Sequence, residues 1–353
     1  MARMWKHRTL TDAADLPPSP LPMPGEQAQQ WCNFVVWMPT DIPAGCILHM
    51  GTLRQEAPPG RVGDHTAGRT PWSANNPAAY RFEITGPHRR LRVKQFLYDW
   101  AFPALDHPSL WESAAQAAAL DDEHVVWLGI DYQKNKAASA RLDRTTVELS
   151  VLEGEFSEQE IIALYRAMRP ALPEARSELA HTPFSALSYW ARRPEATNVD
   201  VPIGMWTFRR RRSHTSQWHT NVEAQELVNT LGFPSTIGGL NLECAAQFTD
   251  DEGRIEIEAL YFGGSHQHHE LRLIAQNRGE GSLHVPAAPE DQPGQRELLH
   301  VRSSAVQLAW VDEHFGPFHA VYARGTVQAT LLSSTGVGLD RTWFLEALRE
   351  TMT

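Results

Sequence analysis

Short segments in which apolar and polar residues alternate recur along the chain. An alternation with a period of two residues is typical of strands that bury one face, and these segments are also rich in β-branched and aromatic residues. The connections between them are short, which favours antiparallel pairing. We therefore expect antiparallel β-sheet from the following stretches: RLRVKQF, TTVELSVL, GRIEIEALYF, AVQLAWV and TVQATLL.

Two amphipathic helix patterns follow the strand-like segments. The stretch SEQE at 157–160 has the form of a capping box, and an apolar face runs from Ile161 to Met168. Near the end of the chain, Asp340 is placed to cap a second helix whose apolar face includes Phe344 and Leu348. Each set of strands is thus predicted to end in a helix that covers one face of a sheet.

The same course of patterns occurs twice. VVWLGI, followed by VELSVLEGEFSEQEIIALYRAM, resembles QLAWVD followed by VQATLLSSTGVGLDRTWFLEALRETM. Trp127 and Trp310 in these stretches lie 183 residues apart, as do Arg166 and Arg349. Such spacing indicates an internal duplication.

A second match lies in the middle of each half. HRRLRVKQ at 88–95 resembles HHELRLIAQ at 268–276, which aligns His88 with His268 and Arg92 with Arg272. The duplication therefore extends over several strands.

The duplication predicts an α+β protein of tandem pseudo-duplicated domains, each a curved antiparallel sheet with a covering C-terminal helix. We expect an N-terminal extension at 1–27, a first repeat at 28–170, a linker at 171–204 and a second repeat at 205–353.

Some segments do not fit the shared plan. Alanine-rich 109–123 and the connection at 174–196 have helical patterns, and 221–233 is expected to form a helix that opens the second half. The stretch 55–79 is dense in Pro, Gly and Asn and is expected to form a long loop.

Net charge narrows the possible partners. The 353-residue chain carries a formal charge of −10 with a pI near 5.9, so its field repels phosphate backbones and anionic membrane surfaces. The basic run Arg209–Arg212 is the local exception, as either a solvated edge or an anion contact. We expect neither nucleic acid nor membrane partners.

The three cysteines indicate the compartment. They show no CxxC spacing, which argues against a disulfide scaffold or a structural zinc site. Neither a signal peptide nor a spanning segment is evident in the pattern. We expect a soluble, cytoplasmic, tryptophan-rich protein.

The stretch SHQHHELRL raises the possibility of a metal site. On a strand, His266, His268 and Glu270 would share one face, and two histidines with a carboxylate suit a transition metal. The aligned strand of the first half is strongly cationic and could not hold a metal. A polar strand face or an anion contact by His88, Arg92 and Arg272 is therefore favoured over metal binding.

The segment 97–111, LYDWAFPALDHPSLW, has no counterpart in the second half. Asp106 beside His107 supplies the parts of a general acid/base pair, with Asp99 or Tyr98 to orient them. Trp100 and Trp111 provide aromatic lining. An Asp before His-Pro is also typical of a turn or a helix cap.

These features favour a cofactor-independent enzyme that uses side-chain acid/base chemistry on a small, partly aromatic or anionic substrate held in a cleft. The alternative is a binding or assembly module that presents a cleft or sheet edge to a protein partner. A metal-dependent enzyme using His266, His268 and Glu270 is the weaker alternative. Motifs for nucleotides, phosphate loops, nucleophile elbows and zincins are absent from the sequence.

Overall fold

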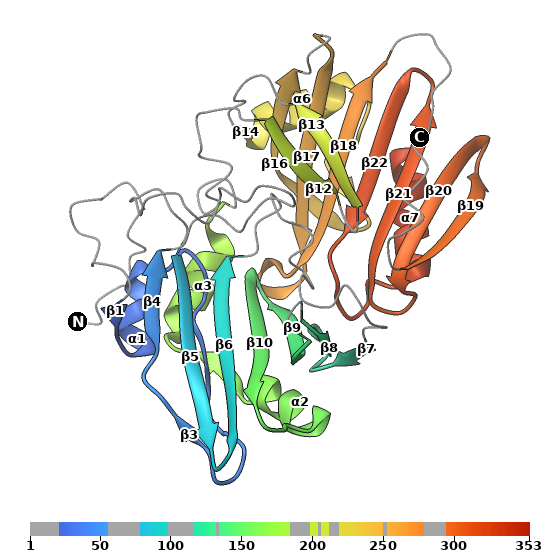
Figure 1. Ribbon diagram of the computed structural model, residues 1–353. Helices are drawn as coiled ribbons and strands as arrows, with labels where there is room; N and C mark the ends of the chain where they lie inside the picture. The colour runs from blue at the N-terminus through green and yellow to red at the C-terminus, as the bar shows by residue number, and fades with distance from the viewer. Residues whose placement is uncertain are drawn as a thin grey trace. The chain divides into compact units, whose positions relative to one another are not determined.

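The computed structural model describes residues 21–55, 78–97, 116–131, 134–183, 198–203, 206–211, 219–249, 253–278 and 294–353. The described elements form two compact units, one reaching from β1 to α3 and the other from β12 to α7 (Figure 1). Each unit is considered by itself.

The first unit is built on a nine-stranded antiparallel sheet. Its strands are β1 (Leu21–Pro22), β3 (Ile47–Leu48), β4 (Thr52–Gln55), β5 (Ala78–Gly86), β6 (Arg89–Leu97), β7 (Gln116–Ala119), β8 (Val125–Ile130), β9 (Lys136–Leu142) and β10 (Thr145–Glu153). They are ordered β1-β4-β5-β6-β10-β9-β8-β7, with β3 beside β5. After β6 the chain crosses to the far edge and returns strand by strand, so β10 pairs with β6.

Short helices and a small two-stranded sheet accompany this large sheet. They are α1 (Gly25–Ala28), η2 (Gln29–Trp31), α2 (Glu158–Arg166), α3 (Pro173–His181) and the pair β2 (Trp37–Pro39) and β11 (Met168–Pro170).

The second unit has the same strand order. Its large sheet comprises β14 (His219–Thr220), β15 (Thr236–Ile237), β16 (Leu240–Thr249), β17 (Ile255–Gly263), β18 (His269–Asn277), β19 (Gln295–Val301), β20 (Ser304–Asp312), β21 (Gly316–Arg324) and β22 (Val327–Ser333). The order is β14-β16-β17-β18-β22-β21-β20-β19, with β15 beside β16. Its other elements are α6 (Asn221–Thr230), η5 (Ser265–Gln267), α7 (Arg341–Thr351) and the hairpin of β12 (Asn198–Ile203) and β13 (Trp206–Arg211).

The predicted α+β duplication is confirmed at the level of two similar antiparallel halves, each ending in a helix (Figure 1). Ser157 caps α2 and forms the expected capping box with Glu160. Asp340 caps α7, accepting a bond from the Trp343 backbone N–H at 2.8 Å. Each cap accepts hydrogen bonds from amide groups that the first turn of its helix leaves without partners. The two caps therefore have the same role in the two halves.

The two tryptophans that the sequence aligns, Trp127 and Trp310, lie on equivalent strands but on opposite faces of their sheets. β8 and β20 hold the same position in their sheets, yet Trp127 pairs with Ser139 whereas Trp310 pairs with Phe318 in the helix-covered core. Leu128 pairs with the buried Ala138 and lies on the same sheet face as that residue. Its neighbour Trp127 therefore lies on the opposite face. A one-residue difference in register moves a side chain to the opposite face.

Each large sheet has a helix-covered face and a second face, here called the distal face. In the second unit α6 and α7 pack on residues such as Leu271, Leu273 and Phe318. In the first unit Leu91 and Val93 are buried on the corresponding side. The alternate residues of each strand form the distal face.

One predicted helix is wrong. Residues Gln116–Ala119, within the alanine-rich 109–123, form the edge strand β7 paired with β8. Alanine favours helix, but pairing with a neighbouring strand overrides this weak preference. The helix expected at 221–233 is confirmed as α6, and α3, which begins at Pro173, covers the start of the helical pattern at 174–196. No helix among the described residues is long and apolar enough to cross a membrane.

Candidate functional site

The turn between β9 and β10 is unusual because its charged residues are buried. Asp143 and Arg144 form this two-residue turn, and Asp143 has a positive φ of 53°. Arg141, immediately before it on β9, is buried as well. Turns normally lie at the surface, and buried arginine or aspartate is rare unless it is paired. The turn therefore requires a specific set of polar partners.

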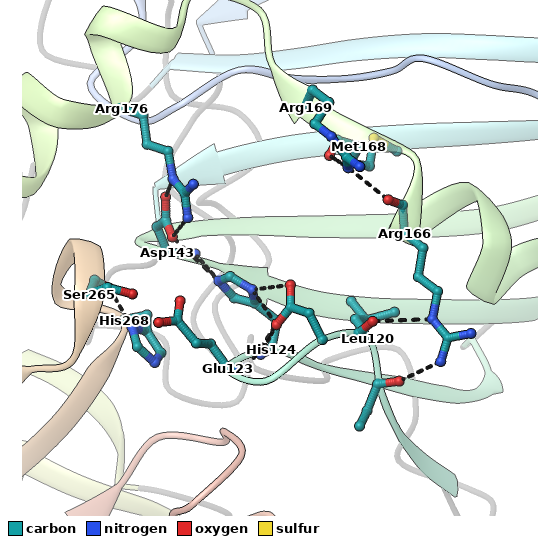
Figure 2. Close-up of polar contacts among 12 residues, drawn as sticks. Leu120, Glu123, His124, Asp143, Arg166, Met168, Arg169, Arg176, Ser265 and His268 are labelled. Carbon is teal, nitrogen blue, oxygen red and sulfur yellow. Dashed lines mark hydrogen bonds and ion pairs between the residues drawn. The ribbon is translucent and has the colours of Figure 1, made fainter.

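A polar network supplies several of those partners (Figure 2). The Asp143 carboxylate accepts two bonds from Arg176 of α3, at 2.8 Å from Nε and 3.0 Å from Nη2. Its Oδ1 lies 3.3 Å from Nε2 of His124, which immediately precedes β8. The other His124 nitrogen, Nδ1, lies 2.8 Å from Oδ2 of Asp121. The imidazole is thus held between two carboxylates.

His124 keeps a partner for both ring nitrogens in either protonation state. Its Nε2 lies 3.3 Å from the Asp143 carboxylate and also 3.3 Å from the Asp143 backbone N. A protonated ring donates to the carboxylate, whereas a neutral ring with its proton on Nδ1 accepts from the backbone N–H. Burial lowers the His124 pKa, but the bonds and charges of Asp143 and Asp121 outweigh burial and leave the pKa raised. The network therefore favours the imidazolium.

Asp143 responds to its partners in the opposite sense. Burial raises its pKa, but bonds from His124 and Arg176 outweigh burial, so the pKa is lowered overall. The folded state thus stabilises the ionised carboxylate between two cations.

The contribution of the network to the free energy of unfolding depends on pH. Because the folded pKa of His124 is raised, this contribution is complete below the unfolded pKa of about 6.5 and is lost as pH rises through the folded pKa. Because that of Asp143 is lowered, its contribution is complete above about 3.9 and is lost as pH falls through the folded pKa. Urea unfolding should give the wild type a lower free energy of unfolding at about pH 8.5 than at about pH 5.5. This difference between the two pH values should be smaller in His124→Gln. An equal difference in both proteins would contradict the assignment.

The side chains at the turn are predominantly basic. Arg141 donates from Nε to the Asp143 carbonyl at 2.9 Å, and Arg144 donates to the Thr182 carbonyl at 2.8 Å. These are bonds to neutral acceptors, so neither of them neutralises a guanidinium charge. The turn thus brings two buried guanidinium groups next to the buried carboxylate of Asp143.

Two adjacent threonines on β10 differ in their bonding. The Thr145 hydroxyl donates to the Val35 carbonyl at 2.9 Å. Thr146 is almost fully buried on the distal face, directly opposite Arg141, and its hydroxyl finds no hydrogen-bond partner within the described parts of the chain. A buried hydroxyl without a partner is costly and calls for an explanation such as a ligand.

The predicted acid/base segment starts beside this turn. Leu97, the last residue of β6, pairs with Thr145 at the same end of the sheet. The chain continues from there into 98–115, which lies outside the described residues. That segment holds most of the predicted site residues: Tyr98, Asp99, Trp100, Asp106, His107 and Trp111.

The two arginines proposed as anion contacts occupy equivalent strands but different environments. Arg92 on the distal face of β6 pairs with Glu83 at 2.8 Å, and their side chains are 45% and 32% exposed. Arg272 on the distal face of β18 pairs with Glu258, and both side chains are 2% exposed. His88 lies in the turn before β6 with a φ of 57°, so the expectation that it shares a strand with Arg92 is wrong.

The three residues considered as a metal cluster do not share a strand face. His266 belongs to the short helix η5, His268 follows it, and β18 begins only at His269, so of the three residues only Glu270 is on the strand. The positive φ values of Gly264 and His266 turn the chain here and break the alternation that the sequence suggested. Within the described ranges, no group of three or more His, Cys, Asp or Glu is arranged to hold a metal ion.

The network at the turn joins residues that lie far apart in the sequence. His124 and Asp143 are separated by 19 residues, and Arg176 lies a further 33 residues along the chain. The only local signal was Asp143-Arg144 between two strand patterns, which indicates a two-residue hairpin but not its burial.

Comparisons of this chain with protein-family models, with curated proteins and with solved structures gave no match.

Proposed function

We propose that the chain binds a small, partly aromatic anion at the β9–β10 turn and acts on it by side-chain acid/base chemistry without an organic cofactor. One observation carries the proposal. On β10, directly opposite the buried Arg141, lies the buried hydroxyl of Thr146, which has no hydrogen-bond partner among the described residues. A bound carboxylate would accept a hydrogen bond from that hydroxyl.

The roles within this proposal differ between residues. Arg141 and the Thr146 hydroxyl, which lie opposite each other on neighbouring strands, would contact the anion. His124 and Asp143 are positioning residues, since their bonds hold the turn in place. Asp106 and His107 remain the proposed proton-transfer pair, because their segment follows Leu97, which pairs with Thr145 next to the turn.

A change at Thr146 tests whether its hydroxyl serves a ligand. Thr146→Val should raise the free energy of unfolding of the unliganded protein by roughly 1 kcal/mol, because an unsatisfied buried hydroxyl is removed. The neighbouring Thr145→Val should instead lose about 1 kcal/mol, since it removes a made bond. Urea unfolding of both variants would measure the pair of effects, and equal destabilisation would contradict the assigned bonding.

Phenylpyruvate, an aromatic acid with exchangeable α-protons, allows binding and catalysis to be measured separately. Calorimetry should detect binding to the wild type, weakened in Thr146→Val, and little binding of the neutral phenylacetone. Proton NMR in deuterated water should show α-proton exchange above the buffer rate, lost in His107→Ala while binding persists. Absence of binding would overturn the site, and binding without exchange would overturn the enzyme proposal in favour of a binding module.

A further inference from the structure

Among the described residues, β19 is the longest of the strands that end the two large sheets. It ends the strand order of the second unit and pairs with β20 along its seven residues without a register shift. The other strands that end these sheet orders are shorter, with two residues in β1 and β14 and four in β7. An edge strand of this length presents a row of backbone donors and acceptors to a further strand.

The sequence of β19 has few of the features that usually block such pairing. QRELLHV contains neither proline nor lysine, and no bulge interrupts its ladder with β20. Leu298 at its centre is 65% exposed. The carboxylate of Glu297 is held by Arg341 at the start of α7, so this charge already has a partner within the chain.

The hairpin geometry decides which backbone groups face outward. A two-residue turn, Arg302 and Ser303, joins β19 to β20 and makes Val301 and Ser304 a hydrogen-bonded pair. Alternate residues from Val301 back to Gln295 therefore bond to β20. The backbone N–H and C=O groups that point away from β20 belong to the residues between them: Arg296, Leu298 and His300.

We propose that a second copy of this chain adds to β19 as an antiparallel strand, with Leu298 facing Leu298 across a two-fold axis. Outward groups must meet outward groups, so the axis passes through a residue position and not between two residues. An axis at Leu298 pairs all seven residues and sets Arg296 opposite His300. An axis at Glu297 would set two carboxylates opposite each other, and an axis at Leu299 would shorten the overlap.

The proposed contact produces a dimer that cannot grow into a longer assembly. A two-fold pairing of β19 uses this edge in both copies, and the opposite edge of the same sheet is the two-residue β14. Isologous pairing of one edge produces a dimer, whereas pairing of two different edges would produce a fibre. We therefore expect a concentration-dependent dimer.

Analytical ultracentrifugation of the full chain over a wide concentration range provides the test. The wild type should dimerise, and Leu298→Lys should weaken dimerisation at least about tenfold, because two ammonium groups would face each other at the axis. Leu298→Glu should act likewise, and an equimolar mixture of the two variants should dimerise again through Lys–Glu pairs.

A matched control separates the edge from general surface hydrophobicity. Ile255, at the start of the internal strand β17, is 47% exposed, and Ile255→Lys should leave dimerisation unchanged. Circular dichroism would confirm that each variant is folded. A wild type that stays monomeric overturns the proposal, as does a dimer that Leu298→Lys leaves intact or that the mixed variants fail to restore.

Discussion

Asp143→Asn is expected to lower the free energy of unfolding by about 3 kcal/mol, at the lower end of the roughly 3–5 kcal/mol cost of breaking a buried ion pair. The carboxylate accepts from Arg176 and lies beside His124, and neutralising it leaves both cations without their shared anion. The lower end applies because the Arg176 side chain is 26% exposed and water can screen part of its charge.

A second substitution at the same position separates charge from backbone conformation. Asparagine tolerates the positive φ of Asp143, whereas alanine is strained there, so Asp143→Ala should lose about 1 kcal/mol more than Asp143→Asn. Chemical unfolding of both variants near neutral pH would measure the two terms. A loss below about 1 kcal/mol in Asp143→Asn would show that the network adds little to stability.

Arg272→Met is expected to destabilise the protein by about 3–5 kcal/mol. Arg272 and Glu258 are both buried, so removing the guanidinium leaves a buried carboxylate without the cation that it pairs with in the folded protein. The double variant Arg272→Met with Glu258→Leu should recover most of that loss, because two well-packed apolar side chains replace a buried pair at little net cost.

The first unit supplies the control for this prediction. Arg92→Met alters the arginine of the equivalent strand, whose pair with Glu83 is exposed, and should change stability by no more than about 1 kcal/mol. Denaturant titrations of the three variants test the comparison. Similar losses in Arg92→Met and Arg272→Met would refute the idea that burial sets the cost, and no recovery in the double variant would point to a packing role for Arg272.

Local patterns were enough to predict much of the fold. Alternation identified strands such as β6 and β10, and Ser157 and Asp340 correctly indicated where the covering helices begin. Each of these signals depends on residues within a few positions of each other. The duplication indicated that the same series of elements occurs twice along the chain.

The failures arose where tertiary contacts decide the conformation. The alanine-rich 116–119 became a strand because β8 offered an edge to pair with. His266 left the strand face because the backbone turns at Gly264 and His266. The Trp127 and Trp310 alignment had the right strand and the wrong face, since spacing along the chain does not specify register to one residue.

The sequence by itself determined two similar α+β halves, the places where their covering helices begin, and an arginine at the same place in each central strand. Only the tertiary structure decided that Arg92 stays in water and Arg272 is buried, and that His124, Asp143 and Arg176 meet around one turn. The physical reason is that local propensity acts between near neighbours in the chain. The burial and pKa of a charged group depend instead on side chains that packing brings together from distant positions.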